Sequence, residues 1–209
     1  MISFAVLIPV KSSGAKSRLS SVLSSAERRE LEALLLSGVL RALREAGLLA
    51  ATHVVSSDNE ILRLATRSGA GTVREARDEG VNAAVEAGVG YLGRPEKVLV
   101  LPSDLPLLRP SQLKHMFRLS EVLQVVIAPS ASFNGTNALL FRPRDGLALS
   151  YDNDSFWNHI RASGRKGLSV AVVSNPGLSF DLDSPDDLRN IQHARVRAPA
   201  IAFARRVAR

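Results

Sequence analysis

The sequence predicts an α/β fold, a three-layer sandwich in which helices cover both faces of a mostly parallel, mixed central sheet. Apolar runs alternate with helical patterns through the first 120 residues, as is typical of strand–helix–strand units. The segment Val98–Leu101 is wholly apolar, as expected for a strand buried on both faces. Because the chain shows no internal repeat and no low-complexity linker, we expect one domain over residues 1–194.

Composition excludes several classes of site. The chain has 209 residues and no cysteine, which rules out disulfides, thiolate catalysis and cysteine-ligated zinc. Its first apolar run, Phe4–Ile8, ends at Pro9 and is too short for a signal peptide or a membrane span. We therefore expect a soluble cytoplasmic protein with no membrane partner.

The basic charge is concentrated at the end of the chain. Residues 195–209 contain five arginines and no acid, out of a formal net charge of +7. We interpret them as a basic C-terminal tail that is solvated or contacts an acidic partner. Only 5% of residues are aromatic, and no basic–aromatic interleaving suggests nucleic-acid binding. A homodimer is compatible with the sequence, which does not decide the oligomeric state.

The first half of the chain gives clear signals for its elements. Strands are expected at residues 3–8, 52–56 and 72–73. Ser24 and Glu27 form a capping-box pattern at the start of a helix that ends at Gly47. Asp58 suits the N-cap of a helix over 60–67. Asn82 is expected to cap a helix over 83–91 or, as the less favoured alternative, to hydrogen-bond a base.

The second half continues the alternation with one change. Pro110 suits the first turn of a helix to about residue 120, and strands are expected at 124–128, 138–141 and 168–173. A helix over 155–163 places Ser155 and His159 on one face. A lone histidine there is more often structural than catalytic. The last helix should run over residues 185–194.

Asp104 is the main candidate for chemistry. It follows the buried strand and lies between Pro102 and Pro106, so its carboxylate is held in a stiff loop at the strand's carboxyl end. Ligands bind in that crevice in open α/β sheets. A metal ligand and an ordinary cap or turn residue are about equally supported by this stretch alone.

Two further groups carry charge that suits a polyphosphate and a metal. Lys11, Lys16 and Arg18 follow the first strand closely, although their loop matches no phosphate-binding motif and a flexible basic loop is an equal alternative. Asp181 and Asp183 lie on the same side of an extended segment, about 6–7 Å apart. A helix cap would explain one of these two aspartates but not both.

These features together resemble the nucleotidyltransferases of the Rossmann-like, nucleotide-diphospho-sugar transferase type. Within that class the chain is most similar to the 2-phospho-L-lactate guanylyltransferase family of deazaflavin coenzyme F-420 biosynthesis. Each motif is weak alone, but five in one order are fairly specific. They are Ile8–Lys11 with Lys16–Leu19, Leu101–Pro106, Asn134–Asn137, Ser155–His159 and Asp181–Leu188.

The resemblance implies a role for each matching residue. The catalytic residues would be Lys11, Lys16, Arg18 and Asp104, with GTP as substrate. The nucleotide would also contact Pro9, Val10, Ser56, Asn82 and Ser103. Two Mg²⁺ ions would be held by Asp104, Asp181 and Asp183. The acceptor would contact Thr136, Asn137 and Ser155. Many members have glycine where this chain has Asp152, and the arginine-rich tail lies outside the motifs.

The implied reaction transfers GMP from GTP to the phosphate of 2-phospho-L-lactate or phosphoenolpyruvate and releases pyrophosphate. The alternatives are a molybdopterin guanylyltransferase or a sugar-phosphate nucleotidyltransferase, and then a basic binding protein acting through its tail. The first two usually begin with a glycine-rich loop, whereas residues 9–19 contain only Gly14.

Overall fold

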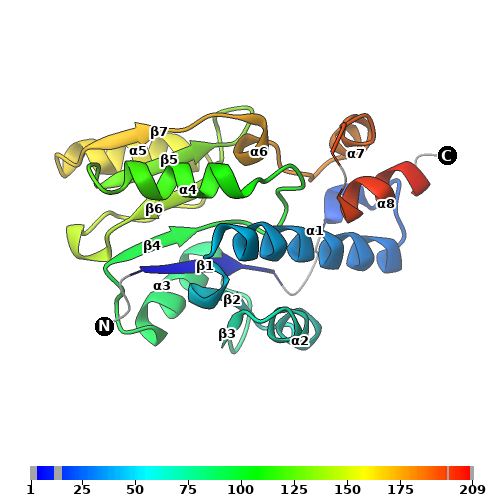
Figure 1. Cartoon of the computed structure of the whole chain (residues 1–209), viewed down its shortest axis with the longest axis horizontal. Helices are drawn as coiled ribbons and strands as arrows, with labels where there is room; N and C mark the ends of the chain where they lie inside the picture. Colours follow the sequence, from blue (N-terminus) through cyan, green and yellow to red (C-terminus); the bar gives the residue numbers. More distant parts are fainter. Residues whose placement is uncertain (1–3, 12–15, 197, 208–209) are drawn as a thin grey trace.

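A seven-stranded sheet forms the centre of the molecule in a computed structural model that describes residues 4–11, 16–196 and 198–207 (Figure 1). The strand order is β3-β2-β1-β4-β6-β5-β7. The first four strands are parallel to one another, and β6 is antiparallel to both of its neighbours. The strands are β1 (Phe4–Pro9), β2 (Thr52–Ser56), β3 (Gly71–Arg74), β4 (Lys97–Val100), β5 (Val125–Pro129), β6 (Thr136–Phe141) and β7 (Val170–Val172).

Helices cover both faces of this sheet, so the predicted three-layer, mostly parallel sandwich is confirmed. The α-helices are α1 (Ser25–Ala46), α2 (Asn59–Arg67), α3 (Val81–Tyr91), α4 (Pro110–Leu119), α5 (Ser155–Arg165), α6 (Pro176–Ser179), α7 (Pro185–Ile191) and α8 (Pro199–Val207). Short 3-10 helices are η1 (Ser17–Leu19), η2 (Leu49–Ala51) and η3 (Pro143–Asp145). No helix within these described ranges is long and apolar enough to cross a lipid bilayer.

The core divides into two layers because side chains alternate along buried strands. Leu99 of β4 packs with α1, α2 and α4 on one face, whereas Val98 and Val100 pack with α3 and α5 on the other. Both faces of β4 are therefore apolar, as the run Val98–Leu101 predicted, and the carboxyl end of β4 is fixed in the middle of the sheet.

Most helix ends follow the predicted chemistry. Ser24 and Glu27 form the capping box of α1, and Gly47 ends that helix with a φ of 80°. The carboxylate of Asp58 accepts the N–H groups of residues 60 and 61 at the start of α2. Ser184 caps α7 through the N–H of Asp187. Because Ser184 performs that task, Asp181 and Asp183 are both left for other contacts.

The predicted cap at Asn82 is wrong. Helix α3 begins at Val81, and its N-cap is Gly80, whose φ of 92° suits glycine. Asn82 lies inside the first turn, where its side-chain oxygen accepts the N–H of Tyr151 at 2.9 Å. Its amide therefore joins α3 to the segment before α5.

The basic tail is not a free extension of the domain. Residues 199–207 form α8, which packs against α7 and against the N-terminal half of α1 (Figure 1). Ile201, Phe203 and Ala204 are buried there, and Arg206 pairs with Glu30 of α1 at 2.7 Å. Arg197, Arg209 and the first expected strand residue, Ser3, lie outside the described residues. The interpretation as a solvated tail overlooked the buried apolar residues that share α8 with Arg205 and Arg206.

The close packing of α3 on β1 depends on one glycine. A Cβ at Gly88 would lie 2.8 Å from both terminal methyl groups of the fully buried Leu7, whereas a Cβ at Gly90 would meet nothing within 4 Å. Gly88 thus allows a close approach that any larger residue disturbs.

We predict that Gly88→Ala lowers the free energy of unfolding by about 1 kcal/mol, because overpacking outweighs the helix-propensity gain of alanine. The matched variant Gly90→Ala should raise it, by up to about 1 kcal/mol. Urea unfolding of both variants measures the difference, and equal stabilisation by the two substitutions would contradict the packing argument.

Candidate active site

The ammonium group of Lys16 joins the first loop to both acidic segments. Its Nζ lies 2.8 Å from Oδ2 of Asp104 and 3.4 Å from Oδ1 of Asp183. The Lys16 side chain is only 8% exposed. Burial by itself lowers the pKa of this lysine, but attraction and hydrogen bonds from Asp104 and Asp183 outweigh burial and hold the pKa above its usual value. Lys16 therefore remains a cation.

The two acidic segments are also joined through the backbone. The N–H of Leu182 donates to the carbonyl oxygen of Asp104 at 3.1 Å, which places Asp181 and Asp183 beside the carboxyl end of β4. Arg18 adds a contact to Asp183 at 3.0 Å, with its own side chain 76% exposed. Such an exposed pair contributes little to stability, so Arg18 can exchange this carboxylate for a phosphate at small cost.

Asp181 is a partly buried member of the acidic group. Burial raises its pKa, and the nearby charge of Asp104 raises it further. The side-chain amide of Asn137 donates to Asp181 at 3.2 Å and partly offsets that rise. Asn137 is itself buried, so the structure shows it orienting an aspartate. Its predicted contact with an acceptor stays a prediction.

The three predicted metal ligands can be tested against this geometry. Carboxylate oxygens are the donors that Mg²⁺ prefers, and Asp181, whose pKa is raised by partial burial and by the charge of Asp104, is a group that a cation would stabilise. Within the described ranges, however, no three acid, histidine or cysteine side chains are gathered closely enough to hold a metal. The donor chemistry fits magnesium, while Lys16 already lies between two of the carboxylates. The metal assignment stays a prediction.

The predicted acceptor residues lie on neighbouring elements. Thr136 begins β6, next to the carboxyl end of β4, and Ser155 begins α5 with 4% of its surface exposed. His159, one turn after Ser155 on α5, contacts Thr136: its Nδ1 lies 3.0 Å from the Thr136 hydroxyl oxygen. Asp152, which stands where many relatives have glycine, lies 3.5 Å from the amide of Asn82.

The residues predicted to contact the nucleotide differ in their exposure and in their present contacts. Pro9, Val10 and Lys11 line a narrow groove of about 10 Å³ against the start of α3, and Ser103 is half-buried beside Asp104. Ser56 is fully buried, and its hydroxyl accepts the N–H of Asp58. That geometry favours a structural role for the Ser56 side chain.

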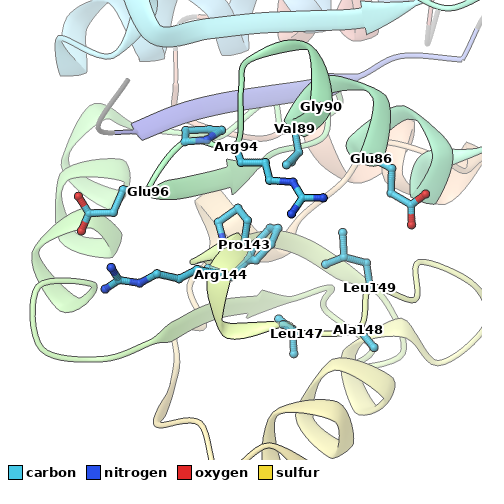
Figure 2. Close-up of a pocket in the computed structure, with 12 residues that line it drawn as sticks. Glu86, Val89, Gly90, Arg94, Glu96, Pro143, Arg144, Leu147, Ala148 and Leu149 are labelled. Atoms are coloured by element: carbon cyan, nitrogen blue, oxygen red, sulfur yellow. The ribbon is translucent and has the colours of Figure 1, made fainter. Parts of the chain in front are cut away.

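Space for ligands is unevenly distributed. A polar cavity of about 330 Å³ adjoins Arg18, Asp181 and Asp183. A larger one of about 760 Å³ lies at the opposite ends of the strands, between the end of α3, the turn before β4 and the segment after β6 (Figure 2). Its lining includes Val89, Pro143, Leu147 and Leu149 and none of the predicted site residues.

Among the described residues, three of the four non-glycine residues with positive φ lie near the predicted site, and the fourth, Arg94, lines the distant cavity. Lys16, Phe133 and Asp154 have φ values of 54°, 59° and 57°, in the left-handed region that non-glycine residues seldom adopt. They belong to the first loop, the turn before β6 and the N-cap of α5. Such conformations cost about 1 kcal/mol or more and persist where surrounding contacts hold them.

Glu32 is a site neighbour that sequence reasoning missed. It lies on α1 and lines a cleft of about 310 Å³ between α1 and α2. Burial raises its pKa to about 7; Asp58 and Asp104 also raise it, and Lys16 opposes the rise. The available signal was its position in the apolar stripe of α1, three, four and seven residues before the buried Leu35, Leu36 and Val39.

Comparison with known proteins gives consistent matches over nearly the whole chain. The model of a family described as "Guanylyl transferase CofC like" matches residues 4–201. A phosphoenolpyruvate guanylyltransferase of Rubrobacter xylanophilus is 40% identical over 92% of this chain and 94% of its own length. A 2-phospho-L-lactate guanylyltransferase of Methanocaldococcus vulcanius is 32% identical over 89% and 83%. A 3-phospho-D-glycerate guanylyltransferase of Phenylobacterium zucineum is 35% identical over 83% and 82%.

Solved structures with low sequence identity share the fold. A protein of Desulfovibrio desulfuricans G20, assigned to the nucleotide-diphospho-sugar transferases, superposes with a TM-score of 0.78 at 16% identity, covering 99% of this chain and 95% of its own. This likeness concerns the fold alone, and it agrees with the sheet topology described above.

The raised pKa of Glu32 predicts a pH-dependent stability. Because the folded state holds this proton more tightly than the unfolded chain, its contribution is complete below about pH 4.5 and is lost as pH rises through about 7. Glu32→Gln cannot ionise and should raise the free energy of unfolding by about 1–2 kcal/mol at pH 8, with no gain at pH 4.5.

Urea unfolding at both pH values measures this difference. Glu45→Gln, at an exposed position of the same helix, is the matched control and should change stability little at either pH. A gain for Glu32→Gln that is equal at both pH values would contradict the burial argument.

Proposed function

The chain belongs to the CofC-like guanylyltransferase family, and from this premise we propose that it transfers GMP from GTP to the phosphate of a phosphorylated three-carbon acid. It is a nucleotidyltransferase of the guanylyltransferase type. The acceptor we propose is phosphoenolpyruvate or 2-phospho-L-lactate, with pyrophosphate as the second product and deazaflavin coenzyme F-420 biosynthesis as the pathway. We also propose that the protein acts in the cytoplasm.

The observation that carries the proposal is the contact of Lys16 with Asp104 and Asp183. It brings a cationic loop and two acidic segments together at the carboxyl ends of the strands, where α/β proteins bind ligands. A triphosphate needs cations, and a cation that bridges phosphates needs carboxylates. Both kinds of group are present within a few ångströms.

The reaction is an in-line attack by the acceptor's phosphate oxygen on the α-phosphorus of GTP. The new P–O bond forms as the bond to the β-phosphate oxygen breaks, and pyrophosphate leaves with that electron pair. A phosphate monoester has a second pKa near 6, so its dianion is already nucleophilic near pH 7. The protein's tasks are to bring two anions together and to stabilise the departing charge.

Each group of residues serves one of these tasks. Lys16 remains charged despite burial and lies where the triphosphate would meet the acidic segments. Lys11 and Arg18 are exposed, and both would contact the β- and γ-phosphates, Arg18 by leaving its surface pair with Asp183. Thr136 and Ser155 would hold the acceptor acid. Asp104, Asp181 and Asp183 would hold magnesium, which when bound neutralises phosphate oxygen charge and orients both substrates.

We predict that Asp104→Asn and Asp183→Asn each lower pyrophosphate release from GTP and phosphoenolpyruvate at least about 100-fold, because each removes a carboxylate from the charged centre. Asp186→Asn is the control, since Asp186 is exposed and pairs with Arg189 on the surface of α7. Rates near that of the unaltered protein in both test variants would exclude the assignment.

Substrate choice is tested by combining four nucleoside triphosphates with three acids: phosphoenolpyruvate, 2-phospho-L-lactate and 3-phosphoglycerate. We expect GTP to give the highest kcat/KM, with phosphoenolpyruvate or 2-phospho-L-lactate as the best acceptor. The acids differ by small groups, so discrimination among them should be about 10- to 200-fold. A higher kcat/KM with ATP or CTP than with GTP would overturn the nucleotide assignment.

A further inference from the structure

His159 is a fully buried titratable group that the proposed transfer reaction does not use. It lies on α5, one turn after Ser155, with no exposed surface. Both ring nitrogens make contacts: Nε2 lies 3.1 Å from the backbone nitrogen of Ser150, and Nδ1 lies 3.0 Å from the hydroxyl oxygen of Thr136. These two contacts determine where its proton resides.

The tautomer follows from the donor at Ser150. A backbone N–H can only donate, so Nε2 must present its lone pair and cannot carry hydrogen. In the neutral ring the hydrogen is therefore on Nδ1, which donates to Thr136. Burial lowers the pKa of His159 to about 4, although a bond to the backbone of Ser155 opposes this. The ring is thus neutral near pH 7.

This tautomer sets the direction of the Thr136 hydroxyl. The hydroxyl has one hydrogen and two lone pairs, and Nδ1–H occupies a lone pair, so the hydrogen must be donated elsewhere. Thr136 is only partly buried and lies beside the carboxyl end of β4. An outward hydroxyl hydrogen suits a carboxylate or phosphate oxygen, whereas an outward lone pair would repel either group.

We propose that His159 is a positioning residue that holds the Thr136 hydroxyl as a hydrogen-bond donor to the anionic acceptor acid. This inference rests on the proposed role of Thr136 in acceptor binding. The same ring fixes Ser150, two residues before Asp152, and Asn82 fixes the adjacent Tyr151. His159 thereby connects the start of β6, the segment before α5 and α5 itself.

The tautomer can be measured in the unaltered protein. Imidazole ¹⁵N shifts and long-range ¹⁵N–¹H correlations distinguish a hydrogen on Nδ1 from one on Nε2. We expect the Nδ1–H form for His159 at pH 7, and the Nε2–H form would overturn the proposal. This measurement needs no substitution and stands even if variants at position 159 fail to fold.

Kinetics of two variants separate the two ring contacts. The amide of His159→Asn ends near the Nδ1 position and can still donate to Thr136, whereas the amide of His159→Gln ends near Nε2 and cannot. We expect His159→Gln to raise KM for the acid about tenfold or more, with KM for GTP nearly unchanged. His159→Asn should recover most of that loss. Equal impairment in both variants, or a parallel rise of both KM values, would overturn the proposal.

A double-mutant cycle with Thr136→Ala distinguishes this inference from the proposed function. If Thr136→Ala leaves KM for the acid unchanged, the acceptor assignment itself fails. If it raises that KM, His159→Gln should add less than about twofold in the Thr136→Ala background. An undiminished effect there would overturn the positioning role alone. His193→Gln, at an exposed histidine, is the control.

Discussion

The pairing of one buried ammonium with carboxylates from two distant segments is the constraint on which the site depends. Lys16 is held in a left-handed conformation with its charge almost out of water, a state that is costly unless the charge is paired. Asp104 and Asp183 provide that pairing, and Leu182 ties their segments through the backbone. Charge pairing, added to the apolar packing of β4, thus decides how the loops meet above the sheet.

Burial also determines the ionisation state on the acceptor side of the site, where it favours a neutral side chain. Burial disfavours the charged form of any side chain. Lys16 stays charged because two carboxylates face it, whereas His159 is neutral because its neighbours are a hydroxyl and a backbone N–H. The candidate site therefore has a charged half suited to a triphosphate and a neutral half whose hydrogen bonds have a defined direction.

Elements with local signals were predicted well, because their causes lie within a few residues. The capping box at Ser24 and the N-cap at Asp58 are of this kind. Two errors show the limit of such reasoning. Asn82 was expected to cap α3, but Gly80 takes that position and the asparagine bonds a segment 69 residues away. The basic tail was judged by its charge, and the buried Phe203 within it was overlooked.

The sequence by itself determined the α/β class, the buried strand that precedes Asp104, and the presence of a cationic loop and a late acidic pair. Only the tertiary structure decided which groups meet and in what ionisation state. Lys16 and Asp183 are 167 residues apart in the chain, and the raised pKa of Glu32 depends on α1, α2 and the first loop together. Pairing and desolvation act through space, so no local pattern encodes them.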